Sequence, residues 1–227
     1  MKYASLLLAL LIWPLACVFA QTPFEGVIRT TVKLVQAPPE LQGMENALGQ
    51  HMTTYVKGNK SRVEQTSISG NNIIITDRES RQVIMLLDMM GQKIAMTLAM
   101  TEDYPGQGVN LTEFEYAGQP IRMTGEIRNI SGYSCEKGIL NLDDNISTEC
   151  WFARAFPFSG LFDKRLPGMP MQYTILQDKV HMEFTLSEIR EEVLDPSIFT
   201  IPDEYTVKTS EEMMQFMPLM QGGPDGE

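Results

Sequence analysis

Between residues 94 and 100, large apolar side chains alternate with small or polar ones. The large residues, at every second position, are Ile94, Met96, Leu98 and Met100. A period of two is that of a β-strand with one face against a core and the other face in solvent. The pattern therefore predicts a strand whose apolar face packs on one side of a sheet.

The same alternation recurs in two other segments, and methionine is prominent in both. The apolar positions there are Ile121 and Met123, and then Met182, Phe184 and Leu186. Sheet cores are ordinarily filled by β-branched and aromatic residues, whereas methionine is unbranched, polarizable and pliable. Two interpretations follow: the methionines fill an ordinary core, or they line a surface that adapts to a flexible apolar ligand.

Strand signals dominate the rest of the chain, and helix signals are few. Strands are predicted at 24–35, 52–56, 60–65, 73–76, 83–87, 92–100, 121–130, 133–140, 146–153, 171–176 and 180–186. Short helices are predicted at 41–48 and 156–166, with one helical turn opened by Asp195 and Pro196. Many short strands at close spacing predict a mainly β domain built on one antiparallel sheet that is strongly curved or closed.

The first 20 residues have the features of a signal peptide. Lys2 precedes a short apolar run at 6–13, and small residues lead to an expected cleavage after Ala20. Cys17 raises a lipoprotein alternative, but Pro14 stands where such a motif normally has Leu, which favours ordinary cleavage. No later stretch is long and apolar enough for a transmembrane helix. We therefore expect a periplasmic or secreted protein with a β domain at 21–205 and a methionine-rich tail at 206–227.

Charge and cysteine usage restrict the partners. The formal net charge of −11 makes nucleic acid and anionic membrane surfaces poor candidates. Cys135 and Cys150 flank a run of turn-forming residues, and a hairpin centred near Leu142 and Asp143 would place them opposite one another. In an oxidising compartment this arrangement predicts a disulfide. The alternatives are free thiols or a metal pair, although no histidine lies nearby to complete a zinc site.

Signals for catalysis are weak. His51 and His181 are the two histidines, and neither belongs to a motif with a nucleophile. The sequence contains no phosphate-binding glycine loop, so we expect no enzyme activity, no cofactor and no metal centre. The methionines between 213 and 220 could bind copper(I) through their thioethers. Phe216 and Leu219 lie among them, as a packing face requires, which favours packing over metal binding.

Two motifs near the middle of the chain carry a family resemblance. T-G-E at 124–126 and I-x-G-Y-x-C at 130–135 resemble the signature of exported bacterial proteins that form a domain of unknown function and look like relatives of the LolA/LolB lipoprotein carriers. Supporting matches are F-E-G at 24–26, Y-x-K-G-x-K-x-R at 55–62, the acidic and aromatic residues of E-C-W at 149–151, G-x-P at 168–170 and F-x-I-P-x-x-Y at 199–205, whereas Cys150 is not part of the shared pattern.

The resemblance implies a curved, incompletely closed antiparallel half-barrel, LolA-like, with a few short helices covering its hollow face. In the carriers that hollow holds acyl chains. We therefore expect a non-enzymatic protein that binds a lipid or acyl chain, with residues 156–166 and the tail as a lid. The residues expected to line the ligand are Ile94, Met96, Leu98, Met100, Ile121, Met123, Met182, Phe184 and Leu186. The alternatives are an envelope structural or interaction protein with a packed core, and copper(I) binding by the tail.

Overall fold

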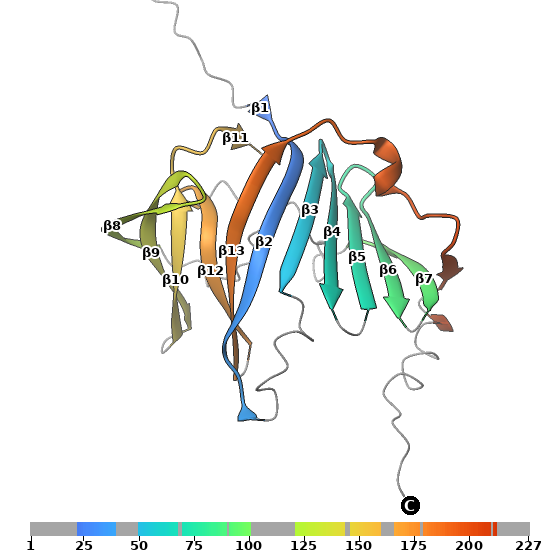
Figure 1. Cartoon of the computed structure of the whole chain (residues 1–227), viewed down its shortest axis with the longest axis horizontal. Helices are drawn as coiled ribbons and strands as arrows, with labels where there is room; N and C mark the ends of the chain where they lie inside the picture. Colours follow the sequence, from blue (N-terminus) through green and yellow to red (C-terminus); the bar gives the residue numbers. More distant parts are fainter. Residues whose placement is uncertain are drawn as a thin grey trace, which may run out of the picture.

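The computed structural model describes residues 22–39, 50–67, 70–89, 91–100, 121–143, 146–159, 166–177, 179–209 and 211–212. Most of these residues lie in β-strands, which follow one another around a curved sheet (Figure 1). The predicted fold class, a mainly β chain with one large, curved and unclosed antiparallel sheet, is confirmed.

Within the described ranges, twelve strands form this sheet in the order β14-β7-β6-β5-β4-β3-β2-β13-β12-β10-β9-β8. Their bounds are β2 Glu25–Gln36, β3 His51–Lys57, β4 Lys60–Ser67, β5 Gly70–Asp77, β6 Gln82–Met89, β7 Gln92–Ala99, β8 Arg122–Ile130, β9 Tyr133–Asp143, β10 Ile146–Ala153, β12 Met169–Gln177, β13 Val180–Glu191 and β14 Thr206–Lys208. Two further strands, β1 (Thr22–Pro23) and β11 (Phe158–Ser159), form a short parallel pair. Each predicted strand is present.

Of the three predicted helical segments, one is observed, one is contradicted in part and one lies outside the described ranges. Asp195 caps a single turn of 3-10 helix, η2 (Pro196–Phe199), as expected. The helix predicted at 156–166 is contradicted at Phe158–Ser159, which extend to pair with β1; residues 160–165 lie outside the described ranges. Also outside them are the predicted helix at 41–48, the expected signal peptide with Cys17, and the methionines at 213–220. None of the described helical segments has the length and apolarity needed to cross a membrane.

The ladder register divides the side chains of the sheet between two faces. Ile28, Phe184 and Leu186 lie on what we call the inner face, and they belong to one buried cluster with Val56 of β3 and Ile130 of β8. Residues from strands this far apart in the sheet join one cluster when the sheet curls toward that face. The inner face is therefore the concave one.

The opposite, outer face is also covered over β2–β7, which the sequence pattern did not predict. Residues 194–205, here called the C-terminal segment, lay Leu194 and Phe199 against this face. Val27, Ile75, Leu86 and Ala95 are the buried residues beneath them. Ala95, expected on a solvated face, is fully buried for this reason. Burial on both faces also explains the run of three isoleucines at 73–75, because a strand covered on both sides needs no alternation.

Two basic side chains hold the C-terminal segment in place. Lys57 Nζ donates to the Leu194 carbonyl at 2.9 Å and forms an ion pair with Glu25 at 2.6 Å. Glu25 in turn accepts from the Leu194 amide at 2.9 Å. Arg62 donates to the Ile198 carbonyl at 2.8 Å. Leu194 and Ile198 lie just before the F-x-I-P-x-x-Y motif. Tyr55 of the first motif, Y-x-K-G-x-K-x-R, shares a hydrophobic cluster with Phe199 and Tyr205 of the second, so the two motifs meet although they are more than 130 residues apart.

The sheet extends past the predicted domain boundary at residue 205. Thr206–Lys208 form β14, which pairs in parallel with β7 through Thr206 and Ile94, and Lys208 and Met96. An unpaired strand edge exposes amide and carbonyl groups that readily take another strand. The start of the predicted tail is thus the last strand of the domain, and it covers part of the β7 edge.

Phe199→Ala should lower the free energy of unfolding by about 3–5 kcal/mol, because it removes a buried aromatic ring from the outer cluster. Urea denaturation measures this loss. Val193→Ala is the matched control, since Val193 is 89% exposed one residue before the C-terminal segment, and it should change stability little. Equal effects of the two substitutions would contradict the assigned packing.

The hydrogen bond from Lys57 lowers the pKa of Glu25 below its ordinary value of 4.5, with the Leu194 amide adding to the shift. A lowered pKa contributes stability that is present above pH 4.5 and is lost as the pH falls through the native pKa. Glu25→Gln should therefore reduce the loss of stability between pH 5 and pH 3, followed by urea midpoints. An unchanged acid profile would show that this contact does not stabilise the fold.

Candidate functional site

Charge is segregated across the half of the sheet formed by β2–β7. The register places every charged residue of these six described strands on the outer face. They are Glu25, Arg29, Lys33, Lys57, Lys60, Arg62, Glu64, Asp77, Asp88 and Lys93. The inner face of the same strands consists of apolar and neutral polar side chains. Because burying an unpaired charge is costly, this pattern indicates a face that is kept from water.

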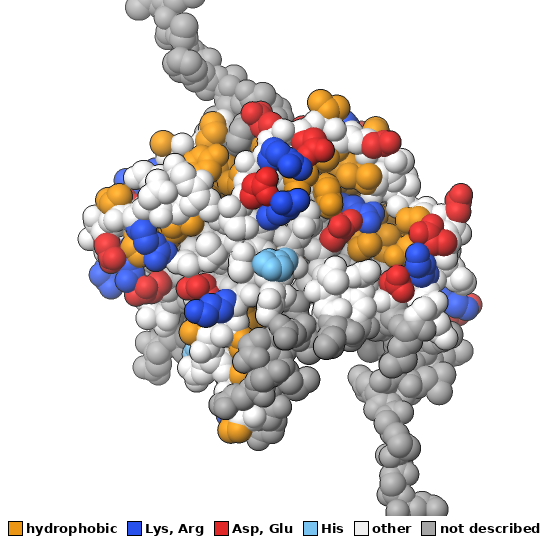
Figure 2. Space-filling view, in the orientation of Figure 1, with side chains coloured by type: hydrophobic (Ala, Val, Ile, Leu, Met, Phe, Trp, Pro, Cys, Tyr) orange, Lys and Arg blue, Asp and Glu red, His pale blue; other side chains and the backbone are white. Residues whose placement is uncertain are grey.

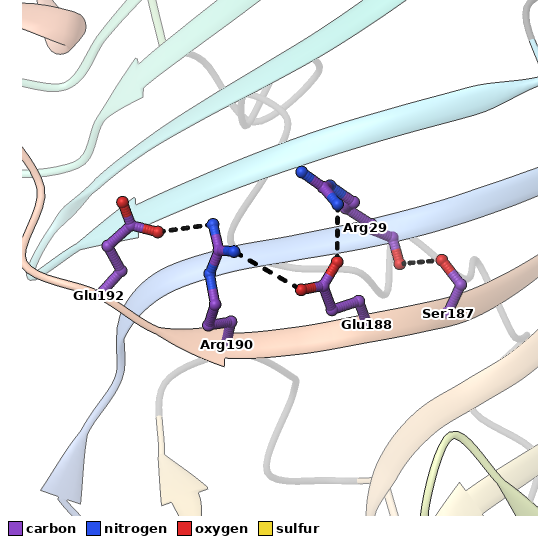
Figure 3. A network of polar contacts seen from close by, with 5 residues as sticks. All are labelled: Arg29, Ser187, Glu188, Arg190 and Glu192. Carbon is purple, nitrogen blue, oxygen red and sulfur yellow. Dashed lines mark hydrogen bonds and ion pairs between the residues drawn. The ribbon is translucent and has the colours of Figure 1, made fainter.

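The charges continue on the outer face of β13, where they are solvated. Glu188 pairs with Arg29 at 2.8 Å and with Arg190 at 3.8 Å, and Arg190 reaches Glu192 at 2.7 Å (Figure 3). Ser187 Oγ donates to the Arg29 carbonyl at 3.1 Å. Acidic and basic side chains also alternate over the visible surface in Figure 2. Exposed pairs of this kind contribute little stability, so we assign the network no chemistry.

Five of the nine residues predicted to line a ligand belong to, or pack against, one buried cluster on the inner face. Phe184 and Leu186 are buried members of this cluster, and Ile121, Met123 and Met182 are partly buried residues packed against it. Ile94, Met96 and Leu98 of β7 face the same side but lie six strand positions away from β13. At about 4.8 Å per strand this is roughly 29 Å along the sheet. Met100 follows β7, where its amide donates to the Arg81 carbonyl at 2.8 Å.

Gly138 explains how Ile121 and Met123 reach the buried cluster. A Cβ at this position would lie 2.8 Å from Ile121 Cγ2, 2.8 Å from Phe152 Cε2 and 3.1 Å from Met123 Sδ. The missing side chain leaves the space that these three groups fill. This end of the inner face is therefore closely packed, and five of the nine predicted residues serve as core.

The other end of the inner face is only half-buried. One row of the ladder runs from Met52 through Gln65 and Asn72 to Leu87 on four adjacent strands. Met85 and Met96 stand directly opposite each other on β6 and β7, beside this row. We call these six residues the inner patch. It is uncharged, half of it is methionine, and Met96 is its one member among the predicted residues.

The inner face also carries buried hydroxyls that the sequence analysis missed. Thr30 and Thr54 are 2% and 1% exposed, and neither Oγ1 has a hydrogen-bond partner. Asn72 Oδ1 is likewise buried without a partner. An unsatisfied buried polar group costs free energy. Threonine fits either face of a strand because it is β-branched, so sequence alone gave no signal for these orphaned hydroxyls.

A family model for a domain of unknown function, DUF4412, matches residues 40–164, which is more than half of the chain. The chain belongs to this family. The DUF4412 match includes the whole inner patch and carries no assigned activity. It does not tie the chain to the LolA/LolB carriers, and it ends before the F-x-I-P-x-x-Y motif.

No curated protein matches the chain. A solved structure of PNGF-II is similar with a TM-score of 0.42 and 12% sequence identity, over 84% of this chain. The match covers 33% of the PNGF-II chain, so this chain spans about a third of that length.

Within the DUF4412 match, the I-x-G-Y motif forms a tight hairpin turn. Ser131 and Gly132 connect β8 and β9 with φ values of 51° and 87°, and Ile130 pairs with Tyr133. Positive φ at both central residues is the requirement of a type I′ turn. Asn129 Oδ1 accepts from the Gly132 amide at 3.1 Å. The motif therefore sets strand register and supplies no reactive group.

The E-C-W segment, which lies within the range that DUF4412 matches, belongs to a cluster of charged and aromatic side chains on β8–β10. Arg128 stacks 4.0 Å from the centroid of the Trp151 ring, and Lys137 lies 5.8 Å from it. Lys137 also pairs with Glu149 at 2.6 Å, and this hydrogen bond raises the Lys137 pKa. Cation–π contacts and an ion pair account for Trp151 and Glu149 of this motif without a catalytic role.

Cys135 and Cys150 are free thiols in the structure, not the expected disulfide. Strand β9 continues to Asp143, which pairs with Ile146, so the turn lies two residues later than predicted. Cys150 is consequently opposite Gly138 instead of Cys135. Burial raises the pKa of both thiols. In the described ranges, no three His, Cys, Asp or Glu side chains are placed to hold a metal ion.

Thr54→Val should raise the free energy of unfolding by about 1 kcal/mol, because it replaces an unpaired buried hydroxyl with a methyl group of the same shape. Thermal or urea unfolding measures the change. Thr53→Val is the control on the half-buried outer face of the same strand, where no such gain is expected. A loss of stability in Thr54→Val would mean that the hydroxyl is satisfied in the native protein.

Proposed function

We propose that this protein is a non-enzymatic binding protein for an apolar ligand of the lipid or acyl-chain class, held against the inner patch. One observation carries the proposal: the inner patch is a contiguous, half-buried surface without charge, and half of its residues are methionine. The charge segregation across β2–β7 supports it, because the solvated groups lie on the other face.

The energetics of such a surface suit a flexible chain. Each CH₂ removed from water contributes about 0.8 kcal/mol, so a long chain binds without many polar contacts. Unbranched methionine side chains adapt to different chain positions at small cost. Met85 and Met96, directly opposite each other on adjacent strands, offer two thioethers to one segment of chain.

An exported setting completes the proposal. The signal-peptide pattern in residues 1–20 and the resemblance of the later motifs to exported proteins support a periplasmic or secreted location. The LolA/LolB resemblance supports an acyl-chain ligand in particular. An envelope protein partner that delivers or receives the ligand fits the same setting.

A second candidate is a structural or interaction protein with a fully packed interior. The closely packed end of the inner face favours this function, since Ile28, Phe152 and Leu186 are all 0% exposed. Native mass spectrometry separates the two functions. Lipid that copurifies with the protein supports the binding function, and a ligand-free mass with no uptake of added lipid supports the structural one.

Met96→Lys should abolish binding of a fluorescent fatty-acid probe, because it places a charge in the uncharged inner patch. Fluorescence titration of the purified protein measures the affinity. Thr97→Lys is the matched control, since Thr97 is the next residue of β7, is exposed and faces outward. Circular dichroism confirms that both variants fold. Unchanged affinity in a folded Met96→Lys protein would overturn the proposed site.

A further inference from the structure

Building on the binding function above, we propose that the ligand is a neutral amphiphile whose hydroxyl-bearing head group hydrogen-bonds to Thr30 and Thr54. The structure offers three buried polar atoms without partners on the inner face: Thr30 Oγ1, Thr54 Oγ1 and Asn72 Oδ1. A pure hydrocarbon leaves all three unsatisfied, whereas a hydroxyl-bearing head group at Thr30 and Thr54 supplies partners for two of them.

The two threonines are neighbours at the edge of the inner patch. Thr30 of β2 lies opposite Met52, and Thr54 of β3 lies opposite Ile28, so the two form a diagonal cross-strand pair. Diagonal pairs on one face of a sheet are separated by about 7–8 Å. That distance places two hydroxyls within reach of one small head group.

Asn72, a member of the inner patch, lies in the same row of the ladder as Thr30. The ladder row from Thr30 runs through Met52 and Gln65 to Asn72, three strands away. At about 4.8 Å per strand, Asn72 lies roughly 14 Å from Thr30. Three of the four side chains in this row are neutral and polar, and Met52 is the apolar one. A head group with more than one hydroxyl matches such a row better than a single compact group does.

The chemistry of the partners restricts the head group. A threonine hydroxyl both donates and accepts, whereas the orphaned Asn72 oxygen only accepts. A hydroxyl head group pairs with both threonines in either direction, and only a donor on the ligand pairs with Asn72. A carboxylate presents none, and the inner face of β2–β7 has no cation to compensate its charge. A glycerol or other hydroxyl head satisfies both conditions.

The cations on the two threonine-bearing strands are turned away from this face. Arg29 adjoins Thr30 on β2 and Lys57 lies three residues after Thr54 on β3, but both point outward, where they pair with Glu188 and Glu25. The same segregation excludes an ammonium head group, because the acidic residues of β2–β7 also face outward. The head group is therefore expected to be neutral, because the inner face of β2–β7 offers neither a cation to an anionic head group nor an acidic residue to a cationic one.

The test is a displacement series with one chain length and three head groups. N-phenyl-1-naphthylamine is bound to the full-length purified protein and displaced by 1-monododecanoylglycerol, dodecanoate at pH 8 or dodecane, each below its aggregation concentration. We expect the apparent Kd of the monoacylglycerol to be at least about tenfold lower than that of dodecanoate or dodecane. The reason is that its hydroxyls form hydrogen bonds with the unpartnered threonines, which the other two compounds do not supply in neutral form.

The double variant Thr30→Val/Thr54→Val should reduce this preference to less than about threefold while leaving displacement by dodecane unchanged. Thr31→Val/Thr53→Val removes two threonine hydroxyls from the outer face of the same strands and should leave the preference intact. Urea unfolding of both double variants shows whether each is folded.

The outcomes separate this inference from the function on which it rests. Equal displacement by all three compounds, tightest displacement by dodecanoate, or a preference that survives in Thr30→Val/Thr54→Val would overturn the neutral head group and leave apolar binding standing. Failure of the wild-type protein to bind the probe or any competitor would overturn the proposed function itself.

Discussion

The arrangement of the molecule depends on placing the charges of β2–β7 on one face of the sheet. Two of those charges have a second task, because Lys57 and Arg62 donate to the carbonyls of Leu194 and Ile198. They thereby hold the C-terminal segment over the buried residues of the outer face, including Phe199. The same segregation leaves the inner face neutral. One pattern of charged residues thus creates both the anchored cover on one side and the uncharged surface on the other.

The strands could be predicted from sequence because a period of two is a local property, visible in ten residues. The cover of the outer face could not, because its contacts join residues such as Arg62 and Ile198 across more than 130 positions. The clue was the consecutive isoleucines at 73–75, which break alternation where both faces are buried. The inner patch was predicted only at Met96, since Met52 and Met85 become its neighbours through pairing register alone.

The pairing register of β9 and β10 also explains why Cys150 does not lie opposite Cys135, as the sequence had predicted. A turn two residues later along the chain moves the residue opposite Cys150 from the expected Cys135 to Gly138. Gly138 is itself required there, because Ile121 and Phe152 fill the space above it. The motifs that carry the family resemblance form a turn at Ser131 and a cation–π stack at Trp151, so they define the scaffold and do not identify a reaction.

The two ends of the inner face differ: one is packed as core, and the other is the half-buried surface at which we propose a ligand binds. Around Phe152 and Leu186 the side chains are fully buried against one another, and methionine there is core. Along Met52 and Met96 the side chains are half-buried. The unpartnered Asn72 oxygen lies among them, and the fully buried Thr30 hydroxyl adjoins Met52. A core optimised for stability alone gains by replacing such threonines with valine. Two such threonines beside a pliable, uncharged surface are not required by a packed core, and they are accounted for by the amphiphile that we propose.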